Sequence, residues 1–179
     1  LIPQSYKDEN LQSLLITTRD ITDIKQAEEL SFKDKLTGLY NRNYMELKID
    51  EIIGNEEFPV SIIMADCNYL KRTNDTKGHE YWDLLLQRVA AVISECIPEN
   101  CVAMRVGGDE FLIVGTHFSS QDADELISKI RQKLAEKSDK SLELSVSFGV
   151  NTTENGQFSF EEAYKLADKA MYKDKQKSR

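Results

Sequence analysis

The chain has 179 residues, of which 40% are hydrophobic and 30% charged, and it contains eight glycines and three prolines. This composition is typical of one globular domain with a short appendage, and it excludes collagen-like, low-complexity and disulfide-dense proteins. The net charge of −8 argues against a protein that binds nucleic acid through a positive surface, but not against one that binds a nucleotide together with metal ions.

The sequence has neither a secretory signal at its start nor an apolar run near the ~18–20 residues needed to span a bilayer. We therefore expect a cytoplasmic domain without membrane contact of its own. The first residue is Leu rather than Met, so the chain could be a fragment of a longer, membrane-anchored protein. The three cysteines form no Cys-x-x-Cys motif, which favours reduced thiols over zinc ligands or disulfides.

The first predicted elements are a short strand and a helix. Residues 11–19 form a β-prone run, and the charged segment after it has apolar residues at three-to-four-residue spacing, at Ile21, Ile24, Ala27 and Leu30. This spacing is typical of a connecting helix or coiled-coil stalk, and equally of a plain surface helix, because two heptads are too few to distinguish them.

The rest of the chain alternates between helix and strand patterns. Helices are predicted where apolar residues recur along one face, over residues 42–53, 79–96, 121–137 and 160–171. Strands are predicted at four apolar runs, residues 60–66, 101–106, 111–115 and 142–150. The second and third runs form a hairpin, because only a four-residue turn with two glycines separates them. The order predicts an α/β sandwich in which helices cover a mixed sheet.

The turn of this hairpin, Gly107-Gly108-Asp109-Glu110, is the most informative stretch. Two glycines allow positive φ angles and let a ligand come close to the backbone. Adjacent carboxylates repel each other unless a cation is near, and hard oxygen ligands of this kind suit Mg²⁺. Taken alone, the stretch still favours an ordinary solvated turn.

A second acid, Asp66, ends the apolar run of residues 60–66 and is followed by a polar loop. Ligands usually bind at the strand ends of α/β sheets. Two acidic strand ends in one sheet are what metal-assisted phosphoryl transfer requires, because the ion bridges phosphate oxygens. A helix-capping or turn aspartate is the alternative interpretation.

Five short blocks follow one another along the chain: Asp34–Arg42; Asp66–Lys71 with Asn74-Asp75 and Gly78-His79; Gly107–Phe111; Ser147–Val150; and Ala167–Tyr172. Together they resemble the GGDEF domain of the diguanylate cyclase family over roughly residues 31–179. The resemblance implies a domain over 34–179 with an α/β (α+β) fold, a ferredoxin-like palm of the nucleotidyl cyclase type. Its central sheet would be mostly antiparallel and covered by helices. Residues 1–20 resemble the end of a PAS-like sensor domain, with 21–33 as a helical linker.

The resemblance implies an enzyme that condenses two GTP molecules into cyclic di-GMP and releases two pyrophosphates. Each 3′-hydroxyl attacks the α-phosphate of the other GTP across an antiparallel pair of domains. This implies a homodimer for catalysis, two Mg²⁺ ions per active site with Mn²⁺ as a substitute, regulation by the upstream sensor domain, and no nucleic-acid partner.

By position, the resemblance makes Asp66, Asp109 and the backbone carbonyl of Cys67 the metal ligands. Asp109 and Glu110 would be the catalytic acids, and which acid activates the 3′-hydroxyl stays open. The remaining expected contacts are with substrate. Ribose and α-phosphate would pack on Gly107 and Gly108, and β/γ-phosphates would meet Lys71, Lys175, Arg179 and the amides of residues 69–71. A solvated basic tail is the alternative for Lys175 and Arg179.

Guanine recognition would depend on Asn74 and Asp83, because an aspartate accepts from both N1–H and the 2-amino group of guanine. The chain departs from the family at Trp82, where glycine is usual, and an indole there could stack on the base or block it. The alternative function is therefore a catalytically weak GTP-binding regulatory module. Pro98 and Cys101 stand where many members have the Arg and Asp of a product-inhibition site, so we expect no inhibition there.

Overall fold

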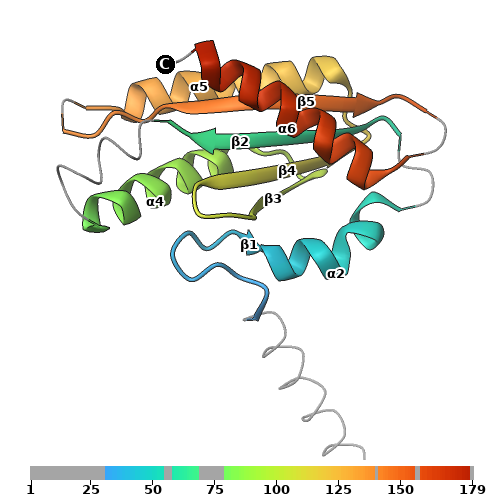
Figure 1. Ribbon diagram of the computed structural model, residues 1–179, viewed down its shortest axis with the longest axis horizontal. Coiled ribbons are helices and arrows are strands. Elements are labelled where there is room, and N and C mark those ends of the chain that lie inside the picture. The colour runs from blue at the N-terminus through green and yellow to red at the C-terminus, as the bar shows by residue number, and fades with distance from the viewer. Residues whose placement is uncertain (1–30, 55–57, 69–78, 140, 156–157, 178–179) are drawn as a thin grey trace, which may run out of the picture. The chain divides into compact units, whose positions relative to one another are not determined.

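The computed structural model describes residues 31–54, 58–68, 79–139, 141–155 and 158–177 (Figure 1). The chain divides into two units between Lys33 and Asp34, and the helices and strands named below lie in the second unit. Several predictions fall outside the described residues. They are the β-prone run of residues 11–19, residues 21–30 of the helical linker, and the expected substrate contacts Lys71, Asn74 and Arg179.

Five strands form one mixed sheet in the order β1-β3-β4-β2-β5. β1 and β3 run parallel, whereas the other neighbouring pairs are antiparallel. The strands are β1 (Tyr40–Asn41), β2 (Val60–Cys67), β3 (Cys101–Arg105), β4 (Glu110–Thr116) and β5 (Val146–Thr153). The helices are α2 (Arg42–Ile53), α4 (His79–Cys96), α5 (Ser120–Lys137) and α6 (Phe160–Lys177). The βαββαβ order from β2 to β5 confirms the predicted α/β fold with its mostly antiparallel sheet.

Two pairs of helices cover the two faces of the sheet, α4 and α5 on one face and α2 and α6 on the other (Figure 1). Because successive side chains of a strand point to opposite faces, β2 supplies both hydrophobic cores. Ile63 and Ala65 lie in the α4/α5 core, and Ile62 and Met64 lie in the α2/α6 core. Every residue of β2 is buried, as its continuous apolar sequence predicts. None of the helices in the described residues is long and apolar enough to cross a bilayer.

Two strands differ from the prediction. β1 has two residues, which is too short to show a hydrophobic period, and the sequence patterns did not predict it. β5 begins at Val146 rather than at residue 142, although Leu142 and Leu144 are buried in the α4/α5 core. Leu142 cannot pair as a strand residue because its N–H and C=O bond the backbone of Asp139, at 3.1 and 3.0 Å. Its apolar side chain therefore indicates burial and not a strand.

The packing of α6 on β5 depends on Gly149. A Cβ atom at this position would lie on the backbone of α6, against the Met171 nitrogen and the Ala167 carbonyl oxygen and 2.7 Å from the Met171 Cα atom. Gly149 thus lets the helix backbone touch the strand, and this close approach sets the position of α6 over the sheet.

We predict that Gly149→Ala lowers the free energy of unfolding by about 1–3 kcal/mol, because the added methyl group fits only if α6 moves away from β5. Gly108→Ala is the matched control. A Cβ atom there has no heavy atom within 4 Å, so the change should stay within about 0.5 kcal/mol. Urea titration measures both variants, and a Gly149→Ala variant as stable as the wild type would contradict the packing.

Candidate active site

The end of β2 and the start of β4 bring two carboxylates face to face. Asp66 pairs with Glu110 across the two antiparallel strands. Asp66 lies two residues after Met64, and Glu110 lies two residues before Leu112, so both side chains project on the α2/α6 face of the sheet. Like charges directly opposite each other on one face are destabilising. This end of the sheet therefore favours a bound positive charge.

The turn between β3 and β4, residues 106–109, brings the Asp109 carboxylate to the same end of the sheet; we name it the acidic turn. The Cys67 N–H donates to the Asp109 carbonyl oxygen at 3.1 Å. Since the N–H and C=O of one residue in an antiparallel strand point to the same side, the Cys67 carbonyl oxygen also faces this turn. The Cys67 side chain lies in the α4/α5 core, where burial raises the pKa of the thiol. Cys67 therefore offers the site its backbone oxygen and not its sulfur.

The two glycines of the acidic turn do not use the positive φ angles that glycine allows. Among the described residues, the glycines with left-handed φ angles are Gly38 and Gly54. Gly107 instead leaves room for Glu110, because a carboxylate oxygen of Glu110 lies where a Cβ atom would be. Gly108 is exposed and has open space where a side chain would project. Glycine serves here for close approach to the backbone.

The last turn of α6 brings a lysine to the acids. The Lys175 ammonium group contacts Asp66 Oδ1, and the two side chains are 22% and 9% exposed. Burial raises the pKa of Asp66, and the charges of Asp109 and Asp168 add to this, whereas Lys175 lowers it. Burial also raises the pKa of Glu110, again with contributions from the neighbouring acids. Asp168 of α6 thus belongs to the electrostatics of the site, although the sequence patterns assigned it no role.

Arg105, at the end of β3, holds the acidic turn in place. Its Nη2 and Nε donate to the Gly108 carbonyl oxygen at 2.7 and 3.3 Å, and its Nη1 lies 3.1 and 3.2 Å from the two carboxylate oxygens of Asp34. Thr37 also donates to Asp34, from its N–H at 2.9 Å and its hydroxyl at 2.6 Å. Burial alone would raise the pKa of Asp34, but the hydrogen bonds from Thr37 and Arg105 outweigh it, and the pKa is lowered. The first sequence block therefore anchors the acidic turn.

Polar contacts hold the end of α6 against the edge strand β5 and against α5. Asp174 Oδ2 accepts from the Phe148 N–H at 3.0 Å and from Arg131 Nη2 at 2.7 Å. Arg131 comes from α5, on the other face of the sheet, and its guanidinium carbon lies 5.5 Å from the centroid of the Phe148 ring. Asp174 directly precedes Lys175, so these contacts hold the turn of helix that carries the lysine.

The first turns of α4 carry Trp82 and Asp83. Trp82 is half-buried and packs against the α4/α5 core, whereas Asp83 is exposed. The expected guanine contact Asp83 thus lies on a helix that covers the α4/α5 face, whereas Asp66 and Glu110 project on the α2/α6 face. Its expected partner Asn74 lies outside the described residues.

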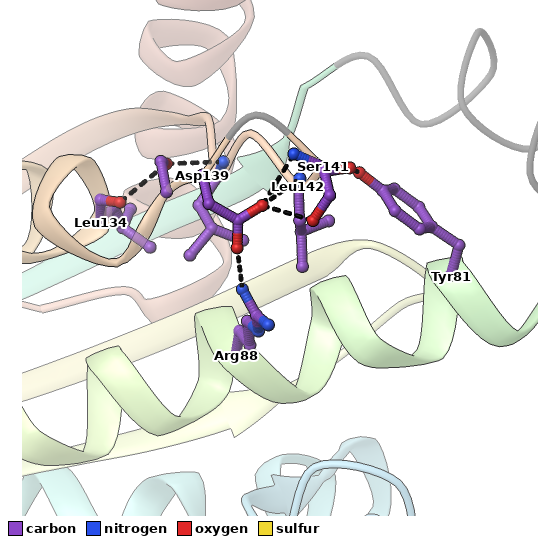
Figure 2. Close-up of polar contacts among 8 residues, drawn as sticks. Tyr81, Arg88, Leu134, Asp139, Ser141 and Leu142 are labelled. Carbon is purple, nitrogen blue, oxygen red and sulfur yellow. Dashed lines mark hydrogen bonds and ion pairs between the residues drawn. The ribbon is translucent and has the colours of Figure 1, made fainter.

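A polar network fixes this part of α4 to the turn that follows α5 (Figure 2). The Tyr81 hydroxyl donates to the Ser141 carbonyl oxygen, and Arg88 Nη1 donates to Asp139 Oδ2 at 3.1 Å. Asp139 Oδ1 accepts from the N–H groups of Ser141 and Leu142 at 2.7 and 2.9 Å. The hydrogen bonds from Ser141, Arg88 and Leu142 hold the pKa of Asp139 well below its usual range.

The donors at this end of the sheet fit a divalent cation by their chemistry. The carboxylates of Asp66 and Asp109 and the carbonyl of Cys67 are hard oxygen ligands of the kind that Mg²⁺ takes. Burial and the neighbouring acids raise the pKa of Asp66, and a bound cation would lower it. In the described parts of the chain, no three His, Cys, Asp or Glu side chains form a ready metal-binding group.

The cysteines add no further ligand to this end of the sheet. Cys67, Cys96 and Cys101 are all free and buried. Burial raises the pKa of the Cys101 thiol to about 12, so this group is neutral at physiological pH. Cys101 therefore carries no negative charge at the position where many family members have that aspartate.

Known proteins resemble this chain in sequence and in fold. A family model described as "Diguanylate cyclase, GGDEF domain" matches residues 31–179. Diguanylate cyclase A of Treponema denticola is 31% identical over 174 residues, which cover 95% of this chain and 45% of that protein. The cyclic di-GMP phosphodiesterase PdeR of Escherichia coli is 34% identical over 126 residues, which cover 68% of this chain and 19% of that protein. The chain therefore spans less than half the length of these curated relatives.

A solved structure shares the fold. The coiled coil and GGDEF domain of DgcB from Caulobacter crescentus, in complex with c-di-GMP, superimposes with a TM-score of 0.81 at 24% sequence identity. The match covers 98% of this chain and 97% of that one. It supports the architecture described above, with helices on both faces of a mixed sheet.

We predict that Glu110→Gln raises the free energy of unfolding of the metal-free protein at neutral pH by about 0.3–1 kcal/mol. The pKa of Glu110 is raised by burial and by neighbouring acids, so its ionised form is disfavoured in the folded chain, and the amide removes this penalty. The gain should be largest above the raised folded-state pKa and should vanish as the pH falls to the ordinary pKa of an unfolded glutamate.

Urea titrations in EDTA between about pH 4 and pH 8 test this prediction. Glu143→Gln, at an exposed position outside the helices and strands, is the control and should change little. A loss of stability in Glu110→Gln at neutral pH would contradict the electrostatic account.

Proposed function

This chain belongs to the GGDEF domain family of diguanylate cyclases, and we propose that it condenses two GTP molecules into cyclic di-GMP with release of two pyrophosphates. The observation that carries the proposal is the convergence of Asp66, Asp109 and Glu110 at one end of the sheet, beside an exposed, open glycine at Gly108. Phosphoryl transfer depends mainly on positioning and on stabilising charge, and an acidic, cation-seeking strand end is suited to both.

Each half-reaction exchanges one bond at phosphorus for another. The 3′-oxygen of one GTP loses its proton and bonds to the α-phosphorus of the other, and the bond from that phosphorus to the pyrophosphate oxygen breaks. Two such steps close the ring and release two pyrophosphates. Because each domain would bind one GTP, the reaction requires two domains facing each other, and we propose an antiparallel homodimer.

The proposed roles of the chain's residues follow from their chemistry. Asp66, Asp109 and the Cys67 carbonyl would hold Mg²⁺, which when bound lowers the pKa of the 3′-hydroxyl and offsets charge on the leaving pyrophosphate. Glu110 lies on the same face as Asp66 and would stand beside the attacking hydroxyl. The open backbone at Gly108 would receive the ribose and α-phosphate.

Other residues would bind the β/γ-phosphates and the guanine base of GTP. Lys175 would bind the β/γ-phosphates, together with Lys71 and Arg179. Asp83 and Asn74 would read guanine, because a paired set of hydrogen bonds leaves buried groups unpaired when adenine enters. The predicted PAS-like sensor of residues 1–20 and the helical linker of residues 21–33 would control how two domains meet, although the family match over residues 31–179 does not include the sensor.

The regulatory-module alternative depends on Trp82, and the packing of this residue weakens it. The indole lies against the α4/α5 core and so has a structural reason to be there. We therefore place the enzyme first and keep a GTP-binding module as the outcome to be excluded by experiment.

We predict that the purified protein, given GTP and Mg²⁺, forms cyclic di-GMP with two pyrophosphates per product. Asp66→Asn and Asp109→Asn should each lower turnover about a thousandfold, because each removes a charged ligand of the catalytic cation. Asp124→Asn, an exposed position on α5, is the matched control and should keep full activity. Chromatography of the products measures turnover, and binding of GTP without any cyclic product would establish the module instead.

We predict that Trp82→Gly lowers the free energy of unfolding by about 2–4 kcal/mol, through lost burial and lost helix propensity, and does not raise turnover. Trp82→Phe keeps an aromatic ring against the core and should stay close to the wild type in both measurements. A large rise in turnover per folded molecule of Trp82→Gly would show that the indole obstructs the substrate.

A further inference from the structure

The contact between Lys175 and Asp66 places a protein cation on a proposed metal ligand. The ammonium group meets Asp66 Oδ1 in a poorly exposed site where Asp109 and Asp168 add negative charge. Lys175 also offsets the charge around Glu110. In the metal-free protein, this lysine therefore supplies the positive charge that the crowded carboxylates favour.

The position of Lys175 is determined by the packing of α6 and is not a chance surface pairing. The buried stripe Ala163, Ala167 and Met171 recurs every four residues, and Lys175 is the next position along it. Gly149 lets this face of α6 touch β5, and Asp174 secures the last turns through the Phe148 N–H and Arg131. These contacts deliver the ammonium group to the end of β2.

An ammonium group and a divalent cation that bind the same carboxylate repel each other, so each weakens the binding of the other. Each would sit within hydrogen-bond or coordination distance of the same few oxygen atoms, which leaves the two positive charges a few ångströms apart. At such separations in a poorly solvated site, the repulsion between them is large compared with thermal energy.

We propose that Lys175 is an internal counter-ion that competes with the divalent cation for Asp66. Lys175 then partly neutralises the negative charge of the free site, and a divalent cation binds weakly until Lys175 leaves. The triphosphate of the proposed substrate offers the ammonium group an alternative partner, so substrate and cation would be taken up together. This inference rests on the metal-ligand role of Asp66 in the proposed function.

The test measures binding of Mn²⁺ alone to the nucleotide-free protein by electron paramagnetic resonance. Lys175→Met removes the charge and keeps the aliphatic stem, and it should bind Mn²⁺ on the order of tenfold or more tightly than the wild type. Lys175→Arg keeps the charge and should bind as weakly as the wild type. Lys173→Met, at an exposed position of the same helix, is the matched control and should leave Mn²⁺ affinity unchanged.

The double variant Asp66→Asn/Lys175→Met locates the effect, because it should lose the gained affinity. Equal or weaker Mn²⁺ binding by Lys175→Met would overturn the inference, as would a gain that persists in the double variant. Thermal unfolding followed by circular dichroism verifies that each variant is folded, and Lys175→Gln is a second neutral variant should Lys175→Met unfold. Failure of the proposed function is a separate result, namely no cyclic di-GMP from GTP and Mg²⁺ by the wild type.

Discussion

Crowded negative charge at one end of the β-sheet is the constraint on which the rest of this structure depends. Asp66 and Glu110 are direct neighbours across two strands, and Asp109 and Asp168 add to the field around them. Burial and mutual repulsion raise the pKa of Asp66 and Glu110, so the folded chain carries an electrostatic penalty at this place. A cation that binds there relieves the penalty. The carboxylates that would bind the cation therefore lower the folding stability of the cation-free protein.

The rest of the domain holds the acids close together by fixing three segments, namely β2, the acidic turn and α6. β2 is buried on both faces, so Asp66 at its end cannot move without disturbing two cores. Arg105 ties the acidic turn to Asp34, and Gly149 lets α6 lie directly on β5. These residues act on the site through geometry, and they explain why the sequence blocks of the family are spread along the chain. Each block fixes one of the segments that must meet.

Local sequence patterns predicted most of the fold, because most elements show a regular spacing of apolar residues and end at turn-forming residues. The continuous apolar run of residues 60–66 indicated a strand buried on both faces, and the structure confirms it. The two-residue β1 had too little sequence to show a period, and Leu142 gave an apolar signal that came from burial in a turn. Gly107 does not adopt the positive φ that glycine allows, and it is required because another side chain, that of Glu110, approaches the backbone there.

The sequence by itself determined the family and the order of the elements apart from β1, and it predicted Asp66, Asp109 and Glu110 as the site acids, because these depend on residue type and on spacing along the chain. The tertiary structure alone decided which charge each acid meets. Asp66 and Lys175 are 109 residues apart, and nothing near either one indicates that they touch. Likewise, the core packing of Trp82 and the contacts of Asp174 across the edge of β5 follow from the path of the helices. Electrostatic interactions act through space, and distances in space exist only once the chain has folded.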